Sequence, residues 1–480
     1  MVYIYFREVR RQLLSVIFDD HKQFEYSIPI IVVGAGGCGI CAALAVKEND
    51  TEVLVIERDS TPLGTTAMST GLIPGANTRL QREAGIQDSP EIFANDIMTK
   101  TKGETDPIIA NCLAKESSTT IEWLIDQYQI PLSLVDSFLY PGHSLMRMHG
   151  TPNRTGSELM GTLCRAAEKS GIDILTNALV TDLFSDSTNR ILGVRILRND
   201  GEIEEVGCEA LILGCCGFAG NPEMIEKYMP QIKEAEFFGH PGNKGDAIIW
   251  GKALGAGLAD ISSYQGHGGL AAGRGVPILW PMIMEGAFQV NENGQRFSNE
   301  SKGYSEQAVE VVSQPNKIAW NIFDERLHKL MMEFEDYHNA IEAKAIMSAN
   351  SISGLSELTG IDEPSLENTM REVEEMVDGK KQDNFGRDFT HKPKLSPPYY
   401  TVKVTGALFH TQGGLVVDET ARVLDTQGNK LPNLFAGGGS ARGISGPSDW
   451  GYMAGNGLLT ATTFGRLAGV AATKLIKEIS

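Results

Sequence analysis

The clearest hydrophobic pattern in the chain lies near its start, between residues 28 and 59. An apolar run at residues 30–33 is followed by a glycine turn, a stretch of small residues with helical spacing, and a second apolar run at residues 53–56. Continuous apolar runs bounded by turns are typical of strands buried on both faces of a parallel sheet. The pattern therefore predicts a strand–helix–strand unit, in which Pro29 opens the first strand and Glu57 ends the second.

The pattern downstream divides the chain into three stretches. The first continues the alternation of helix and strand, the second has longer and more polar helical segments, and the third returns to strands and glycine turns. The predicted helices lie at 156–170, 305–312, 341–349 and 365–377, and the predicted strands at 172–175, 179–184 and 191–197. Three further strand segments that include glycine turns are predicted at 209–218, 406–414 and 433–439. Asp200-Gly201 predicts a hairpin turn, and the charged, proline-bearing run 378–398 is typical of a connector.

We therefore expect an α/β protein in which one domain interrupts another. Residues 27–220 and 395–480 are expected to form the first domain and residues 221–394 an inserted α+β capping domain. Residues 1–26 are expected to form an N-terminal extension, a helix or tail outside the catalytic fold, whose Glu8, Asp19 and Asp20 argue against a secretory signal. The charged helical faces around residues 333–342 and 367–375 are expected to be solvated surface.

The composition narrows the choice of partners. The 480 residues include 61 Asp+Glu against 42 Lys+Arg, a formal charge of −19, which repels nucleic-acid backbones and anionic lipids. No apolar stretch reaches the roughly 18 residues that a membrane-spanning helix needs. Seven cysteines, two of them adjacent at Cys215 and Cys216, are typical of reduced thiols rather than a disulfide framework. We expect a cytoplasmic protein that acts on a small molecule, without a nucleic-acid, membrane or metal partner.

The glycine turn of the first unit carries the clearest chemistry. Gly34, Gly36 and Gly39 have the spacing Gly-x-Gly-x-x-Gly between a strand and a helix, and Glu57 follows at the end of the next strand. Such glycines allow a tight turn, close approach of backbone to a pyrophosphate, and close packing of helix on strand, while the acid receives a ribose hydroxyl. The unit therefore predicts nucleotide binding in a Rossmann-like domain.

Several separated motifs resemble one known family. They are the glycine turn and the segments 85–90, 210–218, 242–246, 295–300, 385–387, 410–414 and 433–469, and they cover nearly everything after Ile28 in the family's order. Jointly they resemble the flavoproteins of the fumarate reductase/succinate dehydrogenase superfamily. The resemblance implies an FAD-binding domain of the glutathione-reductase type with a capping domain, and FAD as the cofactor.

The resemblance also implies which residues contact FAD. They are Gly34, Gly36, Gly37 and Gly39 at the pyrophosphate, Glu57 and Arg58 at the adenosine end, Thr65, Thr66 and Gly71 along the flavin, and Gly217, His410, Gly438, Gly439, Asn456, Gly457, Leu458 and Leu459 around the rest of the cofactor. In the respiratory relatives a histidine tethers the flavin covalently. Because Ala67 and Met68 stand at that place, the implied FAD is non-covalent.

Two departures from the family's pattern concern the substrate. Fumarate reductases have a proton-delivering arginine shortly after the motif at 295–300, where this chain has Tyr304, and their second substrate arginine is missing from the segment that contains Tyr452. This exchange resembles the 3-ketosteroid Δ1-dehydrogenase branch. The resemblance implies an enzyme that dehydrogenates, or in reverse reduces, the carbon–carbon bond α,β to a ketone of a cyclic substrate, with hydride transfer to flavin N5. A 3-ketosteroid and a 4-oxocyclohexanecarboxylate-like compound are the examples.

Phenols are suited to this chemistry. A phenol beside a carbonyl oxygen donates a hydrogen bond that strengthens as enolate charge develops. A phenol with a pKa near 10 needs a nearby cation or a relay before it acts as a base. We assign proton transfer to Tyr304, with Lys302 as a candidate cation, and carbonyl polarisation to Tyr452 and the Gly455 N–H.

Further candidates follow from matching family positions. His267 and Tyr140 are expected at the active site, and His149, Arg154 and Arg442 are weaker candidates for substrate contacts. A carboxylate substrate would require Arg147, Arg154 or Arg442, because the usual arginines are absent.

Three alternatives stay open. One is reduction of an unsaturated carboxylate, as in fumarate reductases, and another is an electron-transfer subunit of a larger redox complex. The chain has no haem-attachment motif or cysteine ladder, so electrons are expected to pass to an external donor or acceptor. The third is a redox dithiol at Cys38 and Cys41, which we interpret instead as small apolar residues in a helix pressed onto its sheet.

Overall fold

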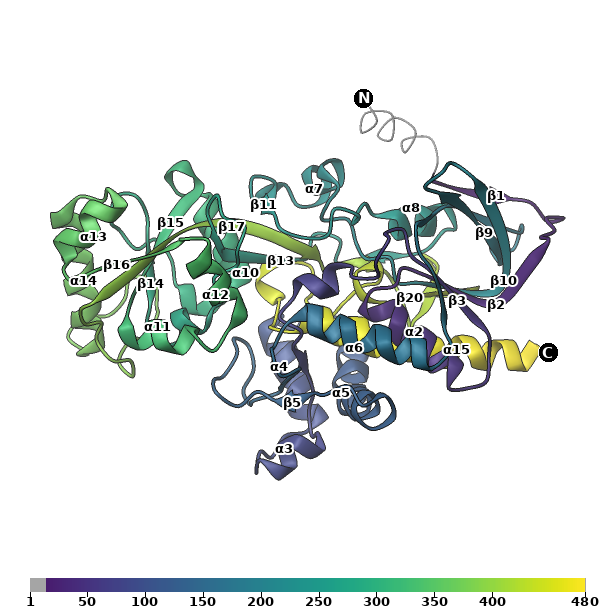
Figure 1. The fold of residues 1–480 in the computed structure, drawn as a ribbon, viewed down its shortest axis with the longest axis horizontal. Helices are drawn as coiled ribbons and strands as arrows, with labels where there is room; N and C mark the ends of the chain where they lie inside the picture. Colours follow the sequence, from purple (N-terminus) through teal and green to yellow (C-terminus); the bar gives the residue numbers. More distant parts are fainter. Residues whose placement is uncertain (1–13, 480) are drawn as a thin grey trace.

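The computed structural model describes residues 14–479, and its two largest hydrophobic cores are each built around their own sheet (Figure 1). The larger core belongs to the main domain, and the smaller core belongs to a cap that extends to the left in Figure 1. The α/β architecture expected from the sequence is confirmed. Within residues 14–479, no helix combines the length and the apolarity that crossing a membrane requires.

The main domain is organised around a nine-stranded sheet. Its strands are β1 (Ser15–Phe18), β2 (Tyr26–Val33), β3 (Val53–Ile56), β7 (Asp173–Leu175), β8 (Ala178–Ser185), β9 (Ile191–Arg198), β10 (Ile203–Leu213), β19 (Arg422–Leu424) and β20 (Lys430–Ala436). The neighbours β10, β2, β3 and β7 run parallel, as the continuous apolar runs predict. Strands β8, β9 and β10 form antiparallel hairpins, and the second of them turns at Gly201 with φ +92°.

The edge strand β1 corrects the expectation for the start of the chain. It pairs in parallel with β8, so residues 15–18 belong to the main sheet rather than to a segment outside the catalytic fold. Four half-exposed residues are too few to show a strand period in the sequence. The rest of the expected helix or tail, residues 1–13, lies outside the described residues.

Two long helices made of small residues pack against each other beside the sheet. They are α2 (Gly37–Lys47), which follows the glycine turn, and α15 (Asn456–Ile479). A Cβ on Gly465 would lie 2.3 Å from the Cys38 carbonyl oxygen, and a Cβ on Gly469 would lie 2.3 Å from the Ala42 carbonyl oxygen. Because only glycine fits at these two contacts, the helices approach each other closely.

The cysteines of α2 belong to this packing. Cys38 and Cys41 are buried, all seven cysteines are free, and burial raises the pKa of the Cys41 thiol to about 12 and that of Cys38 still further. A thiol in such surroundings stays protonated and weakly reactive. The structure therefore favours the interpretation as small apolar residues over a redox dithiol.

The remaining elements of the main domain surround the sheet and the two long helices. The helices are α3 (Arg79–Glu83), α4 (Pro90–Lys100), α5 (Pro107–Tyr128), α6 (Gly156–Lys169), α7 (Pro222–Tyr228) and α8 (Asp246–Ala253). Two small sheets comprise β4 (Ile73–Pro74), β5 (Ser133–Leu134) and β6 (Met148–Gly150), and β12 (Leu258–Ala259) with β18 (Gly414–Leu415). Short 3₁₀ turns lie at η1 (Thr65–Met68), η2 (Pro230–Ile232), η5 (Gly438–Ser440) and η6 (Asp449–Gly451). Helices α3 to α5 lie below the sheet in Figure 1.

The cap is organised around a six-stranded sheet. Its strands are β11 (Glu236–Phe237), β13 (Tyr264–Ala271), β14 (Phe288–Val290), β15 (Ile318–Asp324), β16 (Ile346–Ala349) and β17 (Tyr399–Thr411). Its helices are α9 (Pro281–Met284), α10 (Tyr304–Val312), α11 (Glu325–Met331), α12 (Glu335–Glu342), α13 (Ile352–Thr359) and α14 (Glu363–Val377), with 3₁₀ turns at η3 (Glu300–Lys302) and η4 (Pro315–Lys317). Strand β17 is the centre of this sheet, because it pairs with β11, β13, β15 and β16.

Three features of the cap differ from the sequence pattern. The helix expected at 341–349 is instead the end of α12 followed by β16, whose pairing with β17 overrides its helical spacing. Strand β17 belongs to the cap sheet, although the return to the main domain was expected at residue 395. Helix α8, expected in the cap, buries Trp250 in the main core.

The contact between α2 and α15 generates a test of the fold. Gly465→Ala is expected to destabilise the protein by about 1–3 kcal/mol, because the added methyl would overlap the backbone of α2. Gly161→Ala in α6 is the control, since its Cβ would meet only the Arg165 side chain at 3.5 Å, and it is expected to stabilise by about 0.5–1 kcal/mol. Chemical denaturation measures both values, and equal effects of the two substitutions would contradict the close packing.

Candidate functional site

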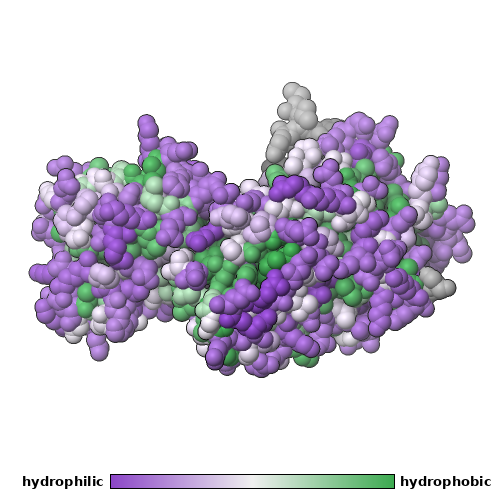
Figure 2. Space-filling model, turned by 60° about the horizontal axis from the view of Figure 1, so that its bottom comes forward, coloured by the Kyte–Doolittle hydropathy of each residue, from purple (hydrophilic) through white to green (hydrophobic). Residues whose placement is uncertain are grey.

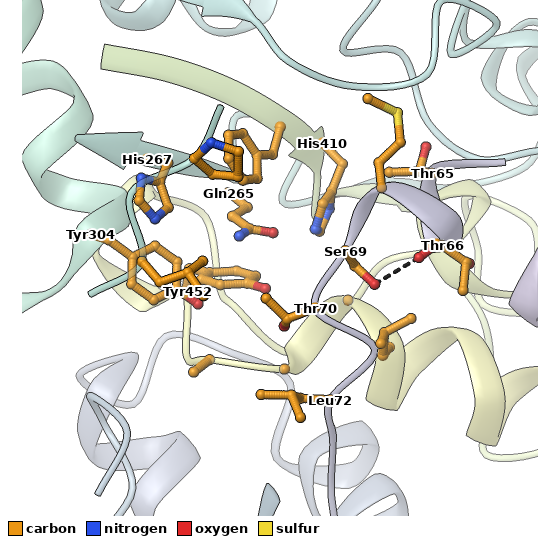
Figure 3. A pocket seen from close by; sticks show the side chains of 18 of the residues that line it. Thr65, Thr66, Ser69, Thr70, Leu72, Gln265, His267, Tyr304, His410 and Tyr452 are labelled. Carbon is orange, nitrogen blue, oxygen red and sulfur yellow. Dashed lines mark hydrogen bonds between the residues drawn. The ribbon is translucent and has the colours of Figure 1, made fainter. Parts of the chain in front are cut away.

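A cavity lies where the cap meets the main domain, and we call it the interdomain cavity. It encloses about 1280 Å³, including its open mouth. Its apolar lining includes Met68, Leu72, Tyr140, Met148, Phe238, Pro277, Leu279, Trp280, Pro281, Phe334, Phe409, Ala454 and Leu458, and its polar lining includes Thr70, Gln265, His267, Tyr304, Asp336, His410, Gln412 and Tyr452. Figure 2 shows hydrophobic side chains gathered between the two lobes, and Figure 3 shows part of the lining.

A second cavity continues from the first to the glycine turn. The two share Thr65, Thr66, Cys216, Gly439 and Ala461, so together they form one elongated space. The far end of this space, which we call the glycine-turn cavity, is lined by Gly34, Gly36, Gly37, Glu57, Arg58, Cys38, His240, Gly438 and other residues. An elongated ligand with one end at the glycine turn and the other beneath the cap fits this shape.

The three glycines of the turn have separate roles. Gly34 has φ +97°, and a Cβ there would lie 2.7 Å from the Gly214 carbonyl oxygen. A Cβ on Gly39 would lie 1.8 Å from the Gly34 carbonyl oxygen, so this glycine allows α2 to pack on its strand. Beside Gly36 the nearest atom to a Cβ would be Thr66 Oγ1 at 3.9 Å. Gly36 therefore presents bare backbone to the cavity at the N-terminus of α2, where a helix favours phosphate.

Glu57 is held rigidly at the end of β3. Its Oε2 accepts a hydrogen bond from the Ala35 N–H at 2.8 Å, and its Oε1 accepts one from the Asp59 N–H at 2.9 Å. The adjacent Arg58 donates to Asp59 and lies 3.2 Å from the His240 ring nitrogen. The carboxylate is thus fixed beside the glycine turn, with lone pairs left for a ligand hydroxyl.

Most residues expected to contact a cofactor line this space, and five do not. Gly39, Gly71, Gly217, Asn456 and Leu459 lie behind its wall. The three glycines pack against backbone or a side chain of a neighbouring segment, and Leu459 is fully buried. Asn456 donates to Ser445 Oγ at 3.1 Å from the first turn of α15. Contact of these five residues with a cofactor stays a prediction.

The interdomain cavity brings together residues that are far apart in the sequence. Tyr304 at the start of α10 and Tyr452 just before α15 have ring centroids 5.9 Å apart. His267 on β13 stacks on Tyr304 at 5.1 Å and on Phe409 at 5.2 Å. Figure 3 shows Tyr304, Tyr452 and His267 on one side of the cavity and His410 above Ser69 and Thr66 on the other. Tyr140 and Gly455 also line it, so all five expected catalytic residues meet in one place.

Burial sets the protonation of these groups. It raises the pKa of Tyr452 and Tyr140, and burial together with the neighbouring Tyr452 hydroxyl raises the pKa of Tyr304 well above its usual value. Burial also lowers the pKa of His267 to about 3 and that of His410 to about 4. The main causes of the shift in the pKa of Tyr304 are burial, neighbouring phenols and a neighbouring acid, so the role expected of Lys302 stays a prediction. The cavity therefore holds neutral phenols and neutral imidazoles.

Two donors point to a role at a carbonyl oxygen. The Nδ1 of neutral His267 accepts a hydrogen bond from the Gly269 N–H at 3.1 Å, which leaves the proton on Nε2. The Gly455 N–H donates no hydrogen bond within residues 14–479. Across the cavity, Gly457 allows the His410 ring to lie on the start of α15, because a Cβ there would be 2.8 Å from His410 Cε1.

The expected substrate contacts lie outside the interdomain cavity. Arg442 pairs with Asp260 and Asp106, at 2.6 and 2.8 Å, and Arg147 is buried against Asp88 at 2.7 Å. His149 is fully buried, with Nε2 2.9 Å from Thr78 Oγ1. Arg154 lies over the Phe334 ring and pairs with Glu333 at 3.8 Å. Within the described residues, no lysine or arginine lines this cavity.

Sequence reasoning missed several polar residues of the lining, among them Gln265 and Asp336. Gln265 points into the cavity (Figure 3), and its amide has no hydrogen bond within residues 14–479. It lies two residues before His267, so the period of a strand was a usable signal. Asp336 lies in a helical face that was expected to be solvated surface, and the placement of α12 over the cavity had no signal in the sequence.

Comparisons with known proteins agree with this geometry. The family described as FAD binding domain matches the chain over residues 29–458. A probable fumarate reductase of Shewanella frigidimarina (strain NCIMB 400) is 28% identical over 447 residues, which cover 93% of this chain and 74% of the relative.

Solved structures give the same picture. The open conformation of a flavocytochrome c3 fumarate reductase matches with a TM-score of 0.79 at 28% identity, covering 94% of this chain and 79% of that one. The 3-ketosteroid-delta4-(5alpha)-dehydrogenase from Rhodococcus jostii RHA1 matches with a TM-score of 0.74 at 23% identity, covering 95% and 98%. At that identity the second match shows likeness of fold alone.

The buried histidines predict how stability depends on pH. Burial lowers the pKa of His143, His149 and His410 to about 4 and that of His267 to about 3, whereas an unfolded histidine titrates near pH 6.5. Between these values the unfolded chain binds more protons, so stability is complete above pH 6.5 and falls as the pH is lowered toward 4. Calorimetry at constant ionic strength should show a falling unfolding temperature from pH 7 to 5.

The exposed His391 provides the control. His391→Asn is expected to leave the slope of unfolding temperature against pH unchanged, since its ring is exposed in the folded protein. A flat profile between pH 7 and 5 in the parent protein would show that the buried histidines do not titrate as described.

Proposed function

The chain belongs to the FAD binding domain family and is an FAD-dependent oxidoreductase, and from this premise we propose that it acts on the carbon–carbon bond next to the carbonyl of an uncharged cyclic ketone. One observation carries the proposal: the interdomain cavity holds three neutral phenols and two neutral imidazoles, and within the described residues no cationic side chain lines it. An apolar ring with one carbonyl matches this lining.

The chain's own residues fit FAD along the elongated space. Gly36, Gly37 and the N-terminus of α2 would hold the pyrophosphate, and Glu57 would accept a ribose hydroxyl. Thr65 and Thr66 line both cavities and would lie along the flavin. Bound FAD supplies the acceptor or donor of the hydride. Its non-covalent attachment stays a prediction.

Three donors would hold the substrate carbonyl in this proposal. The Tyr452 hydroxyl, the free Gly455 N–H and the His267 Nε2–H would stabilise the oxygen as negative charge develops on it. These donors are preorganised by burial, which strengthens hydrogen bonds to a developing charge. Tyr140 extends the apolar wall from the same side, with its ring 4.1 Å from Phe138.

Tyr304 would move the proton at the α-carbon. Because its pKa is raised, the resting side chain is a protonated phenol, the form that delivers a proton in the reductive direction. In desaturation the same oxygen must first lose its proton, and the hydrogen-bonded Tyr452 hydroxyl would serve as the relay. The protonated phenol is therefore in the form that reduction of an enone would use.

A second candidate function is reduction of an unsaturated carboxylate. Similarity to fumarate reductases favours this function, because two of them match most of this chain at 28% identity. It would require a carboxylate to bind without a cation in the lining, which leaves a buried charge uncompensated. We rank it second for this reason. The external electron donor or acceptor stays a prediction in both cases.

Removal of one hydroxyl tests the assignment of Tyr304. Tyr304→Phe is expected to retain bound FAD but to lower the rate of flavin oxidation by a cyclic enone about 10²- to 10⁴-fold, the usual contribution of a general acid. Stopped-flow absorbance of the reduced flavin measures the rate. Tyr400→Phe is the control, since Tyr400 bonds Glu325 at 2.6 Å and does not line the cavity. Full activity of Tyr304→Phe would refute the role.

The charge of the substrate separates the two candidate functions. Reduced enzyme is expected to be reoxidised by cyclohex-2-enone and more slowly by fumarate at equal concentration, because the cavity offers no counter-ion for a carboxylate. Anaerobic reoxidation followed at the flavin absorbance band measures both rates. Faster reoxidation by fumarate would move the conclusion to the second candidate.

A further inference from the structure

One acidic side chain lines the interdomain cavity. Asp336 lies in the first turn of α12, in the cap, and within residues 14–479 its carboxylate has no hydrogen bond or ion pair. Two residues near it in the sequence have other partners. Glu333 pairs with Arg154 at 3.8 Å, and Phe334 packs edge-on to Phe138 with ring centroids 6.2 Å apart. No other acid is found in the described lining.

Asp336 lines the same cavity as the reacting groups, and a chain of aromatic rings connects its neighbour Phe334 with them. Phe138 connects Phe334 to Tyr140, whose ring lies 4.1 Å away, and Tyr140 lies in the same lining as Tyr304. The carboxylate therefore belongs to the cap wall on the Tyr140 side, whereas Tyr452 and Gly455 belong to the main domain. A substrate held by its carbonyl at Tyr452 would extend along apolar side chains toward this wall.

A purely structural role does not account for this acid. A carboxylate in the first turn of a helix is stabilised by the helix dipole, but the exposed Glu335 already occupies that turn in water. Burial and the adjacent Glu335 raise the pKa of Asp336 to about 6, so at neutral pH the group is mostly ionised in apolar surroundings. An ionised carboxylate only accepts hydrogen bonds, and here it meets none from the chain.

We infer that Asp336 recognises a hydrogen-bond donor, a hydroxyl or ammonium group, on the substrate's skeleton at a distance from its carbonyl. The inference rests on the proposed function and deepens it. The substrate would then be a ring compound with a polar group at each end. Its carbonyl would bind at Tyr452, its apolar ring would pack against Leu279 and Trp280, and its hydrogen-bond donor would bind at the cap wall.

Equilibrium binding to the oxidised holoenzyme tests the inference without turnover. The probes are three decalin-type enones that carry a hydroxyl, an ammonium or a methyl group on the ring carbon farthest from the carbonyl. Displacement of the flavin absorbance band on titration gives the Kd of each. The parent protein is expected to bind a donor-bearing probe about 10- to 100-fold more tightly than the methyl probe. In Asp336→Asn this ratio is expected to fall toward one.

A control variant and the comparison of the three probes show what each outcome means for the inference. Glu335→Gln removes a neighbouring exposed charge and is expected to keep the ratio of the parent protein. Preference for both donor-bearing probes assigns a hydroxyl site, and preference for the ammonium probe alone assigns a cation site. A ratio near one in the parent protein, absence of binding, or an unchanged ratio in Asp336→Asn overturns the inference. Binding that depends on Asp336 without reoxidation of reduced flavin would instead overturn the proposed function.

Discussion

The geometry of the site depends on one buried carboxylate. Glu300 lies beneath the start of α10 and pairs with Arg296 at 2.8 Å and with Arg387 at 3.0 Å. Burial alone would raise its pKa, but the two arginines lower the pKa of Glu300 to about 2. Removing one partner from such a cluster leaves an uncompensated buried charge, which commonly costs about 3–5 kcal/mol. The cluster therefore holds its segments in one arrangement.

Those segments are the ones that present Tyr304. Arg387 comes from the connector after α14 and also donates to the Ile283 carbonyl oxygen at the end of α9. Trp280, a wall of the interdomain cavity, donates from Nε1 to the Glu300 carbonyl oxygen at 3.2 Å. One ion cluster thus fixes the turn before Tyr304, the connector and the apolar wall. The charges of this cluster are paired behind the cavity, and neutral phenols and imidazoles line the side of the cavity where the proposed carbonyl would bind.

The sequence predicted the main domain better than the cap, for a physical reason. The strand–helix–strand unit has local signals: continuous apolar runs, and glycines whose spacing is set by the contact of Gly39 with Gly34. In the cap, β16 and β17 are strands because they pair with each other, and nothing local at residues 341–349 reports that pairing. The tyrosines and His267 could be found from motifs, whereas the placement of Arg154, Arg442 and Asp336 depends on which segments meet in three dimensions.

The two phenols that the proposal assigns to proton transfer and to the carbonyl come from different domains. Tyr304 belongs to the cap and Tyr452 to the main domain, yet their ring centroids lie 5.9 Å apart. An ion pair between Lys100 of α4 and Glu306 of α10 joins the same two domains one turn from Tyr304, and Lys100 also donates to the Lys302 carbonyl oxygen at 3.0 Å. Any displacement of the cap would separate Tyr304 and His267 from Tyr452 and Gly455, the groups that the proposed mechanism brings together. In the proposed mechanism, the reacting set is therefore complete only when the cap and the main domain are in contact.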